Sequence, residues 1–566
     1  SKKSGGVTMS HLRFGKSPIK STYLIHQANF VACHNPSYVD KYNMVQELVD
    51  GGTFLLNCPW DMEGLEKHLP GQVKAYIANH NIKFYTIDGI KIGKEIGLGG
   101  RINTVLQSAF FKLAEIIPEE EAISLMKAAA KATYGRKGDK IVQMNYDAID
   151  AGAKQVVEIE VPESWKDAAD EGLAVPHIDE NGRKDVIDFV KNIQTKVNAQ
   201  EGNSLPVSAF TDYADGSTPS GSSAYEKRGI AVDIPIWQPD NCIQCNRCAY
   251  VCPHAVIRPV ALTEEEAANA PEGMQSIPMI GMPDMKFAIT VSAYDCTGCG
   301  SCANVCPGKK GEKALVMGNM EENAGKQTFF DYGREIPVKP EVVAKYKETT
   351  VKGSQFKQPL LEFSGACAGC GETPYAKLIT QLFGERMYIA NATGCSSIWG
   401  NSSPSTPYTV TPEGKGPAWS NSLFEDNAEF GYGMLLAQNT IRNRLKGLVE
   451  KLAADAENED VKAAAQEYLD TYTCGATNGT ATDKLVAALE ACGCDRAEKA
   501  ELLKNKDFLA KKSQWVFGGD GWAYDIGYGG VDHVLASGKD INIMVFDTEV
   551  YSNTGGQSSK ATKTGA

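Results

Sequence analysis

The sequence predicts a multidomain α/β protein, and three observations indicate this fold class. The chain has 566 residues, too many for one hydrophobic core, since a domain usually contains roughly 100 to 200 residues. Its first part alternates short β-like runs with helical runs, the pattern of a parallel α/β domain. Later, one cysteine motif occurs twice, and near the end two β-like runs lead into polar or glycine-rich loops. We therefore expect separate domains with separate chemistry.

The first domain is assigned to residues 1–200. Strands are expected at residues 28–33, 53–57 and 82–87, and helices at residues 39–49, 72–79, 101–117, 119–133 and 140–156. The run Gly97-Leu98-Gly99-Gly100 precedes one of these helices and could cradle a phosphate, but a tight turn is the favoured interpretation.

Turn-forming residues then mark a domain boundary. Residues 201–229 are assigned to a linker, because residues 215–223 contain little that could be buried, and we expect them to be exposed. A second domain follows at residues 230–337, and a third at residues 338–566. Within the third, residues 442–505 are rich in Ala, Lys and Glu and predict a solvated helical segment without chemistry of its own.

The composition excludes several classes of protein. With 42% hydrophobic and 22% charged residues, and no apolar run of about eighteen residues, a membrane protein is not expected. The net charge of −13 argues against nucleic-acid or anionic-membrane surfaces as partners. Half of the sixteen cysteines fall into two tight groups, which favours metal binding in a reducing cytoplasm over a disulfide framework.

The duplicated motif has the spacing Cys-x2-Cys-x2-Cys-x3-Cys-Pro. In this spacing three cysteines hold one iron-sulfur cubane and the fourth reaches the other cubane. One [4Fe-4S] cluster should therefore take Cys242, Cys245, Cys248 and Cys306, and the other Cys296, Cys299, Cys302 and Cys252. Zinc is the disfavoured alternative, because zinc sites usually use separated cysteine pairs. Both stretches resemble the bacterial two-cluster ferredoxins, which implies electron relay.

Three more cysteines form an incomplete ligand set. Cys367 and Cys370 have Cys-x-x-Cys spacing in a glycine-flanked turn, and Cys395 follows in Thr393-Gly394-Cys395. From spacing alone, a cluster, a zinc site and a redox pair all remain open. We expect the remaining candidates near the C-terminus, Cys474, Cys492 and Cys494, to be ordinary cysteines.

A diphosphate site is predicted where a β-like run at residues 514–517 ends in Gly518-Gly519-Asp520-Gly521 and a helix follows at 525–536. Asp520 would supply a hard oxygen to Mg²⁺. A second run, residues 541–546, ends in Asp547-Thr548 and would bring Thr548 to the same metal. Thiamine enzymes carry Gly-Asp-Gly and a strand end at similar spacing, although many have Asn-Asn where this chain has Asp547-Thr548.

Residues 363–372, 391–397, 518–528 and 547–557 together resemble the pyruvate:ferredoxin (or flavodoxin) oxidoreductases, a family of 2-oxoacid oxidoreductases, and the first domain resembles their gamma-type domain. The resemblance implies a third [4Fe-4S] cluster on Cys367, Cys370 and Cys395, with its fourth cysteine beyond Ala566. It implies Mg²⁺ ligation by Asp520, the Thr548 hydroxyl and the Val550 carbonyl. The residues implied to contact thiamine diphosphate are Glu372, Cys395, Asp520, Gly521, Trp522, Ala523, Thr548, Glu549, Val550, Tyr551, Ser552 and Asn553. Among these, Glu372 and Asn553 are the catalytic candidates, with Asn553 facing the substrate.

The activity implied by the resemblance is conversion of pyruvate and coenzyme A to acetyl-CoA and CO₂, with electrons passed to ferredoxin or flavodoxin by an enzyme that is usually a homodimer. The family's catalytic glutamate and substrate-binding arginine lie in domains without a counterpart here, so the chain is expected to be truncated at both ends. Three alternatives remain: an enzyme for another 2-oxoacid, an electron-transfer protein with an inactive thiamine-type domain, and a non-redox thiamine lyase.

Overall fold

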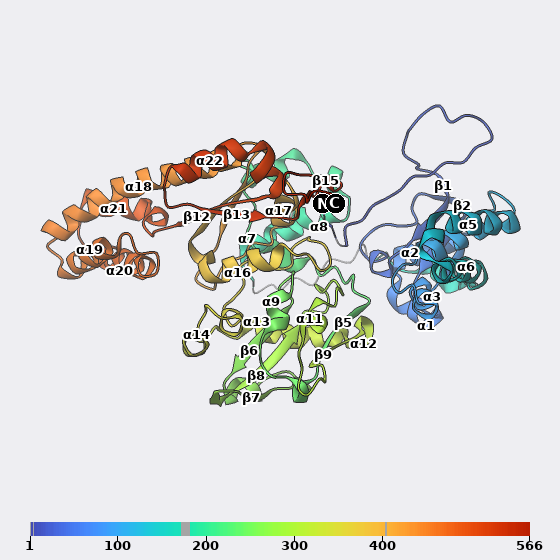
Figure 1. The fold of residues 1–566 in the computed structure, drawn as a ribbon, viewed down its shortest axis with the longest axis horizontal. Helices are drawn as coiled ribbons and strands as arrows, with labels where there is room; N and C mark the ends of the chain where they lie inside the picture. Colours follow the sequence, from blue (N-terminus) through green and yellow to red (C-terminus); the bar gives the residue numbers. More distant parts are fainter. Residues whose placement is uncertain (1, 4, 171–181, 402–404, 566) are drawn as a thin grey trace. The chain divides into compact units, whose positions relative to one another are not determined.

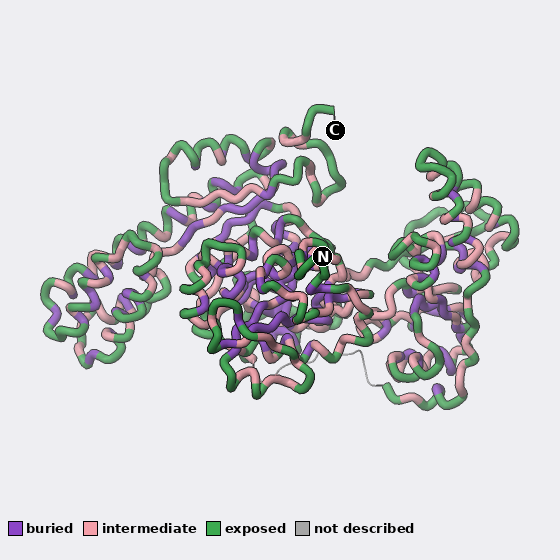
Figure 2. The backbone as a smooth tube through the Cα atoms, turned by 60° about the horizontal axis from the view of Figure 1, so that its bottom comes forward, coloured by how far each residue is buried: buried purple, intermediate pink, exposed green. Residues whose placement is uncertain are grey.

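The structure is a computed structural model that describes residues 2–3, 5–170, 182–401 and 405–565. The chain divides into two compact units, which are described separately. One comprises Val7–Ile178 and Lys191–Ala209, and the other comprises Ser1–Gly6, Asp179–Val190 and Phe210–Ala566 (Figure 1). In each unit the buried positions concentrate at its centre, while turns and outer helix faces are exposed (Figure 2).

The first unit is a parallel α/β domain, as predicted. Strands β1 (Ala28–Cys33), β2 (Leu48–Asn57) and β3 (Lys83–Ile87) pair in parallel in the order β1-β2-β3, and β4 (Val157–Glu158) adds an antiparallel edge. Alternate side chains of β2 enter two cores, with Phe54 and Leu56 in one and Leu55 in the other. The helices are α1 (Met62–His68), α2 (Gly71–Asn79), α3 (Gly89–Ile96), α4 (Asn103–Ala114), α5 (Glu119–Tyr134), α6 (Asp139–Lys154) and α8 (Thr195–Asn198).

Two local expectations for this unit are settled. The helix expected at residues 39–49 is wrong, because Leu48 already pairs with Ala28 in the sheet, and Val39 and Val45 are buried from irregular turns. Their helix-like spacing reflects core packing only. The favoured turn at Gly97–Gly100 is confirmed, since the N–H groups of Leu98 and Gly99 both donate to the Gly93 carbonyl oxygen at the end of α3.

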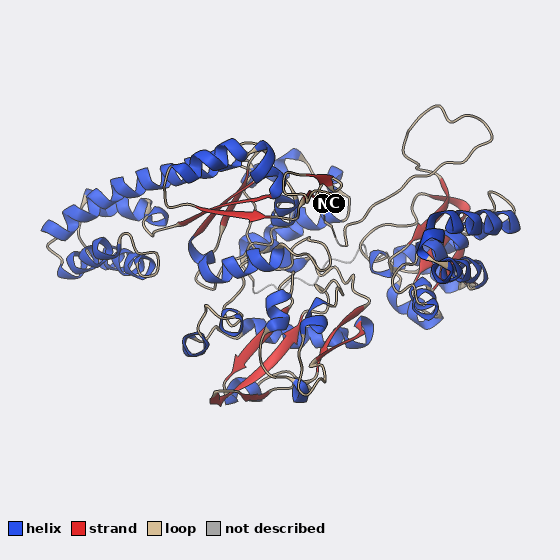
Figure 3. Cartoon of the chain, in the orientation of Figure 1, coloured by secondary structure: helices blue, strands red, loops and turns tan. Residues whose placement is uncertain are grey.

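In the second unit, residues 230–337, called here the cysteine segment, form two small antiparallel sheets (Figure 3). One pairs β5 (Asp233–Trp237) with β9 (Leu315–Asn319), and the other has the order β6 (Ile257–Leu262), β8 (Met282–Val291), β7 (Ile277–Met279). The helices are α9 (Arg247–Val251), α10 (Glu264–Ala268), α11 (Ser301–Val305), α12 (Met320–Asn323) and α13 (Gln327–Glu335).

Residues 338–566, called the C-terminal segment, form a four-stranded parallel sheet in the order β11-β10-β12-β13. Its strands are β10 (Met387–Asn391), β11 (Ala418–Asn421), β12 (Ser513–Gly519) and β13 (Asn542–Phe546), followed by the hairpin of β14 (Val550–Tyr551) and β15 (Gln557–Ser558). Phe517 packs into a core with α16 (Thr373–Phe383) and α17 (Cys395–Gly400), and Val516 into the opposite core with α18 (Asn427–Asp455) and α22 (Tyr528–Ala536). The predicted strands at residues 514–517 and 541–546 are confirmed.

The predicted helical segment is present but begins earlier than expected and has a core of its own. It consists of α18, α19 (Glu459–Thr471), α20 (Asn478–Ala491) and α21 (Ala497–Lys504), packed around Leu445, Tyr468 and Leu485. The short helices α7 (Lys184–Phe189), α14 (Pro340–Tyr346) and α15 (Val351–Ser354) complete the unit. Within the described residues, no helix has the length and apolar character needed to cross a bilayer.

The expected exposure of residues 215–223 is only partly correct. Asp215 and Gly216 are exposed, but Ser222 and Ser223 are buried. The Ser222 hydroxyl accepts a hydrogen bond from the N–H of Thr406 at 2.8 Å, and the Ser223 N–H donates to the Thr406 carbonyl oxygen. Polar turn residues are buried here because a second chain segment satisfies their hydrogen bonds.

A buried carboxylate joins the two segments of the second unit. Glu362, only 2% exposed, accepts hydrogen bonds from Arg258 of β6 at 2.6 Å and from Arg334 of α13 at 2.7 Å. Burial alone would raise the pKa of this carboxyl, but the two guanidinium groups outweigh burial and lower the pKa below its usual value. The C-terminal segment therefore supplies the anion that two cations of the cysteine segment require.

We predict that Glu362→Gln lowers the free energy of unfolding of this unit by about 3–5 kcal/mol, because the buried guanidinium of Arg258 and the partly exposed one of Arg334 lose their shared anion. Urea unfolding measures the loss. Glu348→Gln is the control, since its pair with Lys357 at 2.8 Å is solvent-exposed and contributes about 1 kcal/mol or less. Because folding lowers the pKa of Glu362, its carboxylate stabilises the folded state at any pH above the pKa of the unfolded state. The difference in stability between wild type and Glu362→Gln should therefore shrink as the pH falls below roughly 4. Equal losses in the two variants would contradict the assignment.

Candidate functional site

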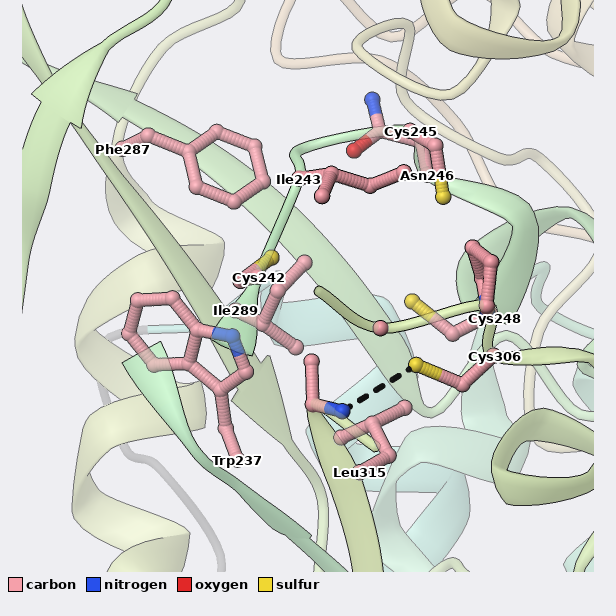
Figure 4. Close-up of a pocket in the computed structure, with 13 residues that line it drawn as sticks. Trp237, Cys242, Ile243, Cys245, Asn246, Cys248, Phe287, Ile289, Cys306 and Leu315 are labelled. Atoms are coloured by element: carbon pink, nitrogen blue, oxygen red, sulfur yellow. Dashed lines mark hydrogen bonds between the residues drawn. The ribbon is translucent and has the colours of Figure 1, made fainter. Parts of the chain in front are cut away.

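Cysteines from both copies of the motif surround a first, small cavity in the cysteine segment. Its sulfur-bearing side chains are Cys242, Cys245, Cys248 and Cys306. Figure 4 shows these four side chains directed into one space, with aromatic and aliphatic side chains, including Trp237 and Phe287, closing the other sides. This is the group of four that the interleaved assignment requires.

A second small cavity is lined by the other group, Cys252, Cys296, Cys299 and Cys302. Helix α9 carries Cys248 to the first cavity and ends beside Cys252 in the second. In the second copy, helix α11 carries Cys302 to the second cavity and ends beside Cys306, which lines the first cavity. One short helix thus contributes a cysteine to each cavity in both copies.

The loops around the cavities repeat the same backbone conformation with different residues. Gln244 and Asn246 have φ angles of 56° and 59°, and the equivalent Gly298 and Gly300 have 68° and 74°. Glycine adopts this left-handed conformation freely, whereas in the first copy the side chains of Gln244 and Asn246 hydrogen-bond to distant segments of the chain. The Asn246 amide, for example, donates to the Lys352 carbonyl oxygen at 2.9 Å. The conformation, which aims the cysteines inward, is therefore retained where glycine is not.

Four of the eight cavity cysteines, Cys252, Cys296, Cys302 and Cys306, are buried, whereas Cys299 is exposed. Burial is the main cause that raises the pKa of Cys296 to about 12, so the thiolate needs a bound cation to form. Backbone N–H groups donate to the sulfurs of Cys242, Cys296 and Cys306 at 3.3–3.4 Å. In the described ranges, no three His, Cys, Asp or Glu side chains converge on a single metal ion. The four cysteines that line each cavity match the four ligands that a [4Fe-4S] cluster takes.

The third thiolate group is divided between two helix starts, with Cys367 and Cys370 just before α16 and Cys395 at the first residue of α17. The Cys370 N–H donates to the Cys367 carbonyl oxygen at 3.1 Å, which closes the turn, and the Glu372 N–H donates to the Cys370 sulfur at 3.4 Å. Cys370 and Cys395 pack against the same core, while Cys367 is exposed. Burial raises the pKa of Cys395, and the charges of Glu372 and Cys370 act in the same direction. The two elements of the motif are thus close in space.

The cysteines of the helical segment are not all ordinary thiols, which corrects the expectation. Cys492 and Cys494 form a disulfide with each other. Cys474 is a free, exposed thiol between α19 and α20. The Cys-x-Cys spacing of these two residues does not by itself indicate a disulfide.

The three residues expected to hold Mg²⁺ are in direct contact. The Thr548 N–H and hydroxyl each lie 3.2 Å from Oδ1 of Asp520, and the Thr548 hydroxyl donates to the Val550 carbonyl oxygen at 3.0 Å. Asp520 is 1% exposed, and its Oδ2 accepts from the Ser559 hydroxyl, a contact that sequence reasoning missed. Carboxylate, hydroxyl and carbonyl oxygens are the donor set that Mg²⁺ prefers, so these residues fit the ion.

Two glycines of this loop are required by packing, in addition to the close approach of a ligand that the sequence predicts. A Cβ at Gly518 would lie 2.4 Å from the Trp522 ring, and one at Gly521 would lie 2.6 Å from the Tyr551 ring. Gly519 has open space, with its nearest neighbour at 3.9 Å. After Asp520 the chain enters one π-helical turn, Gly521–Ile526, before α22, so the expected helix begins earlier and with different geometry. Such turns are frequent at functional sites.

Polar atoms around the loop have unused hydrogen-bonding capacity. Asn553 Oδ1 and Trp522 Nε1 are buried without a hydrogen-bond partner among the residues described, which is typical of groups that await a ligand. Glu372 is buried and accepts from the Trp399 indole at 2.7 Å. Burial raises the pKa of Glu372. A polar ligand would satisfy these groups.

The remaining predicted contacts lie on the loop after β13. The Ser552 hydroxyl is 3.2 Å from the Cys395 sulfur, and the Tyr551 hydroxyl donates to Asp525 at 2.9 Å. Ala523 is buried behind the loop. Glu549 is exposed, with a left-handed φ of 60°. The loop therefore spans the distance between the Asp520 site and Cys395.

Comparison with protein families identifies three regions of the chain. A model described as pyruvate ferredoxin/flavodoxin oxidoreductase matches residues 1–155, a domain of unknown function matches residues 177–231, and a 4Fe-4S dicluster domain matches residues 241–310. The last match covers all eight cysteines of the two cavities.

Curated relatives match the chain over its whole length. A pyruvate:ferredoxin oxidoreductase of Moorella thermoacetica is 53% identical over 100% of this chain and 48% of its own length. A pyruvate-flavodoxin oxidoreductase of Enterobacter agglomerans is 52% identical with the same coverage. A pyruvate dehydrogenase [NADP(+)] of Cryptosporidium parvum is 46% identical over 100% of this chain and 32% of its own length. The chain spans about half the length of the first two.

The composition of the cavities predicts how cysteine variants combine. Cys252→Ala and Cys299→Ala should each remove the cluster of the second cavity, so their double variant should lose about four iron atoms, as each single variant does. Cys252→Ala with Cys245→Ala should instead lose about eight, because both cavities are affected. Iron content per chain and the EPR spectrum of the reduced protein provide the measurement. The opposite combination, with Cys252 and Cys245 acting on one cluster, would refute the interleaving.

Proposed function

We propose that this chain, which belongs to the family of pyruvate:ferredoxin and pyruvate-flavodoxin oxidoreductases, carries the thiamine diphosphate site and the iron-sulfur path of an enzyme that oxidatively decarboxylates pyruvate. The match to a 4Fe-4S dicluster domain and the relation to pyruvate oxidoreductases come directly from the comparisons. The thiamine site, the third cluster and the individual residue roles are the content of the proposal.

The observation that carries the proposal is a continuous sequence of sulfur sites leading away from the Asp520 loop. The Cys395 sulfur contacts Ser552 of that loop at 3.2 Å, and Cys370 packs on the same core as Cys395. A Cβ at Gly369, in the same turn as Cys370, would lie 3.6 Å from the Cβ of Cys299 in the second cavity. Electron carriers in these positions would be close neighbours, which a redox enzyme requires and a non-redox thiamine lyase does not.

Each protein group has a definite role in this proposal. Asp520, the Thr548 hydroxyl and the Val550 carbonyl would hold Mg²⁺ and through it the diphosphate. Glu372 and the unsatisfied oxygen of Asn553 would contact the cofactor and substrate as polar partners in a site otherwise closed by Trp522. When bound, thiamine diphosphate supplies a ring that accepts the electron pair left by the departing CO₂.

The proposed overall reaction is balanced. Pyruvate and coenzyme A give acetyl-CoA, CO₂, one proton and two electrons. Cys367, Cys370 and Cys395, with a cysteine from outside this chain, would hold the cluster that receives the electrons first, one at a time. The clusters of the second and first cavities would then pass them to ferredoxin or flavodoxin.

The substrate and the acceptor are the parts of the proposal that experiments must separate from close alternatives. Relatives that cover the whole chain are named for pyruvate, although the Cryptosporidium parvum protein is named for NADP⁺ as acceptor. We favour ferredoxin or flavodoxin because the two relatives of highest identity reported above are named for them. Reduction of ferredoxin by the holoenzyme, dependent on both pyruvate and coenzyme A, would support this function. If the holoenzyme turned over another 2-oxoacid faster, that acid would replace pyruvate as the proposed substrate.

We predict that Asp520→Ala abolishes Mg²⁺-dependent retention of thiamine diphosphate, because the variant loses the only carboxylate in the oxygen set. Isothermal titration with the cofactor and Mg²⁺ measures the binding. Asp532→Ala, an exposed substitution in the following helix α22, is the matched control and should bind as wild type does. Unchanged binding in Asp520→Ala would exclude this loop as the site.

We also predict that the complete, fully loaded enzyme contains about twelve iron atoms per chain, four for each of three clusters. Cys395→Ser should remove about four and should sharply slow reduction of the clusters in the two cavities, while decarboxylation continues. Cys474→Ser, which changes an exposed thiol in the helical segment, should leave the iron content unchanged. A wild-type content near eight with intact electron transfer would return Cys367, Cys370 and Cys395 to a structural role.

A further inference from the structure

Two lysines from outside the duplicated cysteine motif contact equivalent carbonyl oxygens in its two copies. The Lys313 ammonium donates to the carbonyl oxygens of Asn304 and Cys306 at 2.9 and 2.8 Å, at the end of α11. The ammonium of Lys377 donates to three carbonyl oxygens at the end of α9, those of Ala249, Tyr250 (3.1 Å) and Cys252 (3.2 Å). Tyr250 and Cys252 correspond to Asn304 and Cys306 in the repeat. Both lysines satisfy carbonyls that a helix end leaves free.

The two lysines differ in origin and surroundings. Lys313 is exposed and comes from the loop that follows its own helix. Lys377 is 2% exposed and comes from α16 of the C-terminal segment. Among the described residues, the hydrogen-bond partners of the Lys377 ammonium are three carbonyl oxygens, and no carboxylate pairs with it. Solvent screens the charge of the exposed Lys313 more strongly than the charge of the buried Lys377.

The position of Lys377 makes it a neighbour of both cavities. Helix α9 carries Cys248 of the first cavity and ends at Cys252 of the second. A cation at the end of this helix stabilises negative charge on either side, and a cluster is more negative when reduced. A buried cation without a carboxylate is also costly unless an anion lies nearby, and two anionic clusters would supply that charge.

We propose that Lys377 is a positioning residue that raises the reduction potentials of the clusters in both cavities, and that Lys313, which contacts the equivalent carbonyl oxygens of the other copy, does so only weakly. The inference rests on the proposed function, because it requires a [4Fe-4S] cluster in each cavity. It adds a role for α16, which begins beside Glu372 and carries Lys377 to α9: one helix spans the Asp520 site and the cavity clusters.

The test is an EPR-monitored redox titration of the anaerobic holoenzyme. Lys377→Met removes the charge at similar length and is expected to shift the midpoint potentials of both cavity clusters to lower values, with the iron content unchanged. Lys313→Met removes the same charge from the equivalent, exposed position and should give a clearly smaller shift. Lys377→Gln removes the charge but keeps two hydrogen-bond donors, so it should shift the potentials as Lys377→Met does.

The outcomes separate the two proposals. If the wild-type holoenzyme lacks clusters in the two cavities, the proposed function fails before Lys377 is tested. If the clusters are present and Lys377→Met leaves their potentials unchanged, or shifts them no more than Lys313→Met does, the role of Lys377 is refuted. Wild-type potentials in Lys377→Gln would assign the effect to hydrogen bonding and overturn the electrostatic role. Loss of both clusters in both neutral variants would assign Lys377 to folding alone and likewise overturn the proposal.

Discussion

The arrangement of the second unit depends on charges that one segment supplies to the other. Glu362 of the C-terminal segment neutralises Arg258 and Arg334 of the cysteine segment, and Lys377 satisfies the free carbonyls of α9. Buried charges tolerate little displacement, because a lost partner costs several kcal/mol. The two segments are therefore held in a fixed relative position. This position places Gly369 against Cys299 and so brings the third thiolate group to the second cavity.

The sequence predicted the elements whose signals are local. The parallel sheet of the first unit, the strands flanking Asp520 and the turn at Gly97–Gly100 follow from side-chain period and glycine placement. The apolar spacing of Val39 and Val45 misled because it matches a helix by coincidence, while the pairing of Leu48 with Ala28 is a long-range contact. Burial of Ser222 likewise depends on Thr406, far along the chain, and no local pattern carries that information.

The site divides in the same way. Cysteine spacing predicted which sulfurs share a cavity, since a rigid helical turn translates spacing directly into direction. Ser559 beside Asp520, Trp399 beside Glu372 and the disulfide of Cys492 with Cys494 were missed. The first two contacts form only in the folded structure, and the disulfide joins two cysteines whose spacing is not distinctive. Lys377 is the strongest example, because it belongs to one segment by sequence and acts on the other.

The dependence of α9 on Lys377, and of Arg258 on Glu362, bears on how such proteins can be rearranged by gene fusion and recombination. Residues 230–337 contain all eight cavity cysteines but do not form a self-sufficient module. Excised, they would keep every cysteine but lose the cap of α9 and the counter-charge of two arginines. Transplantation of this eight-cysteine unit into another protein would therefore need both Glu362 and helix α16, or a new surface that replaces them.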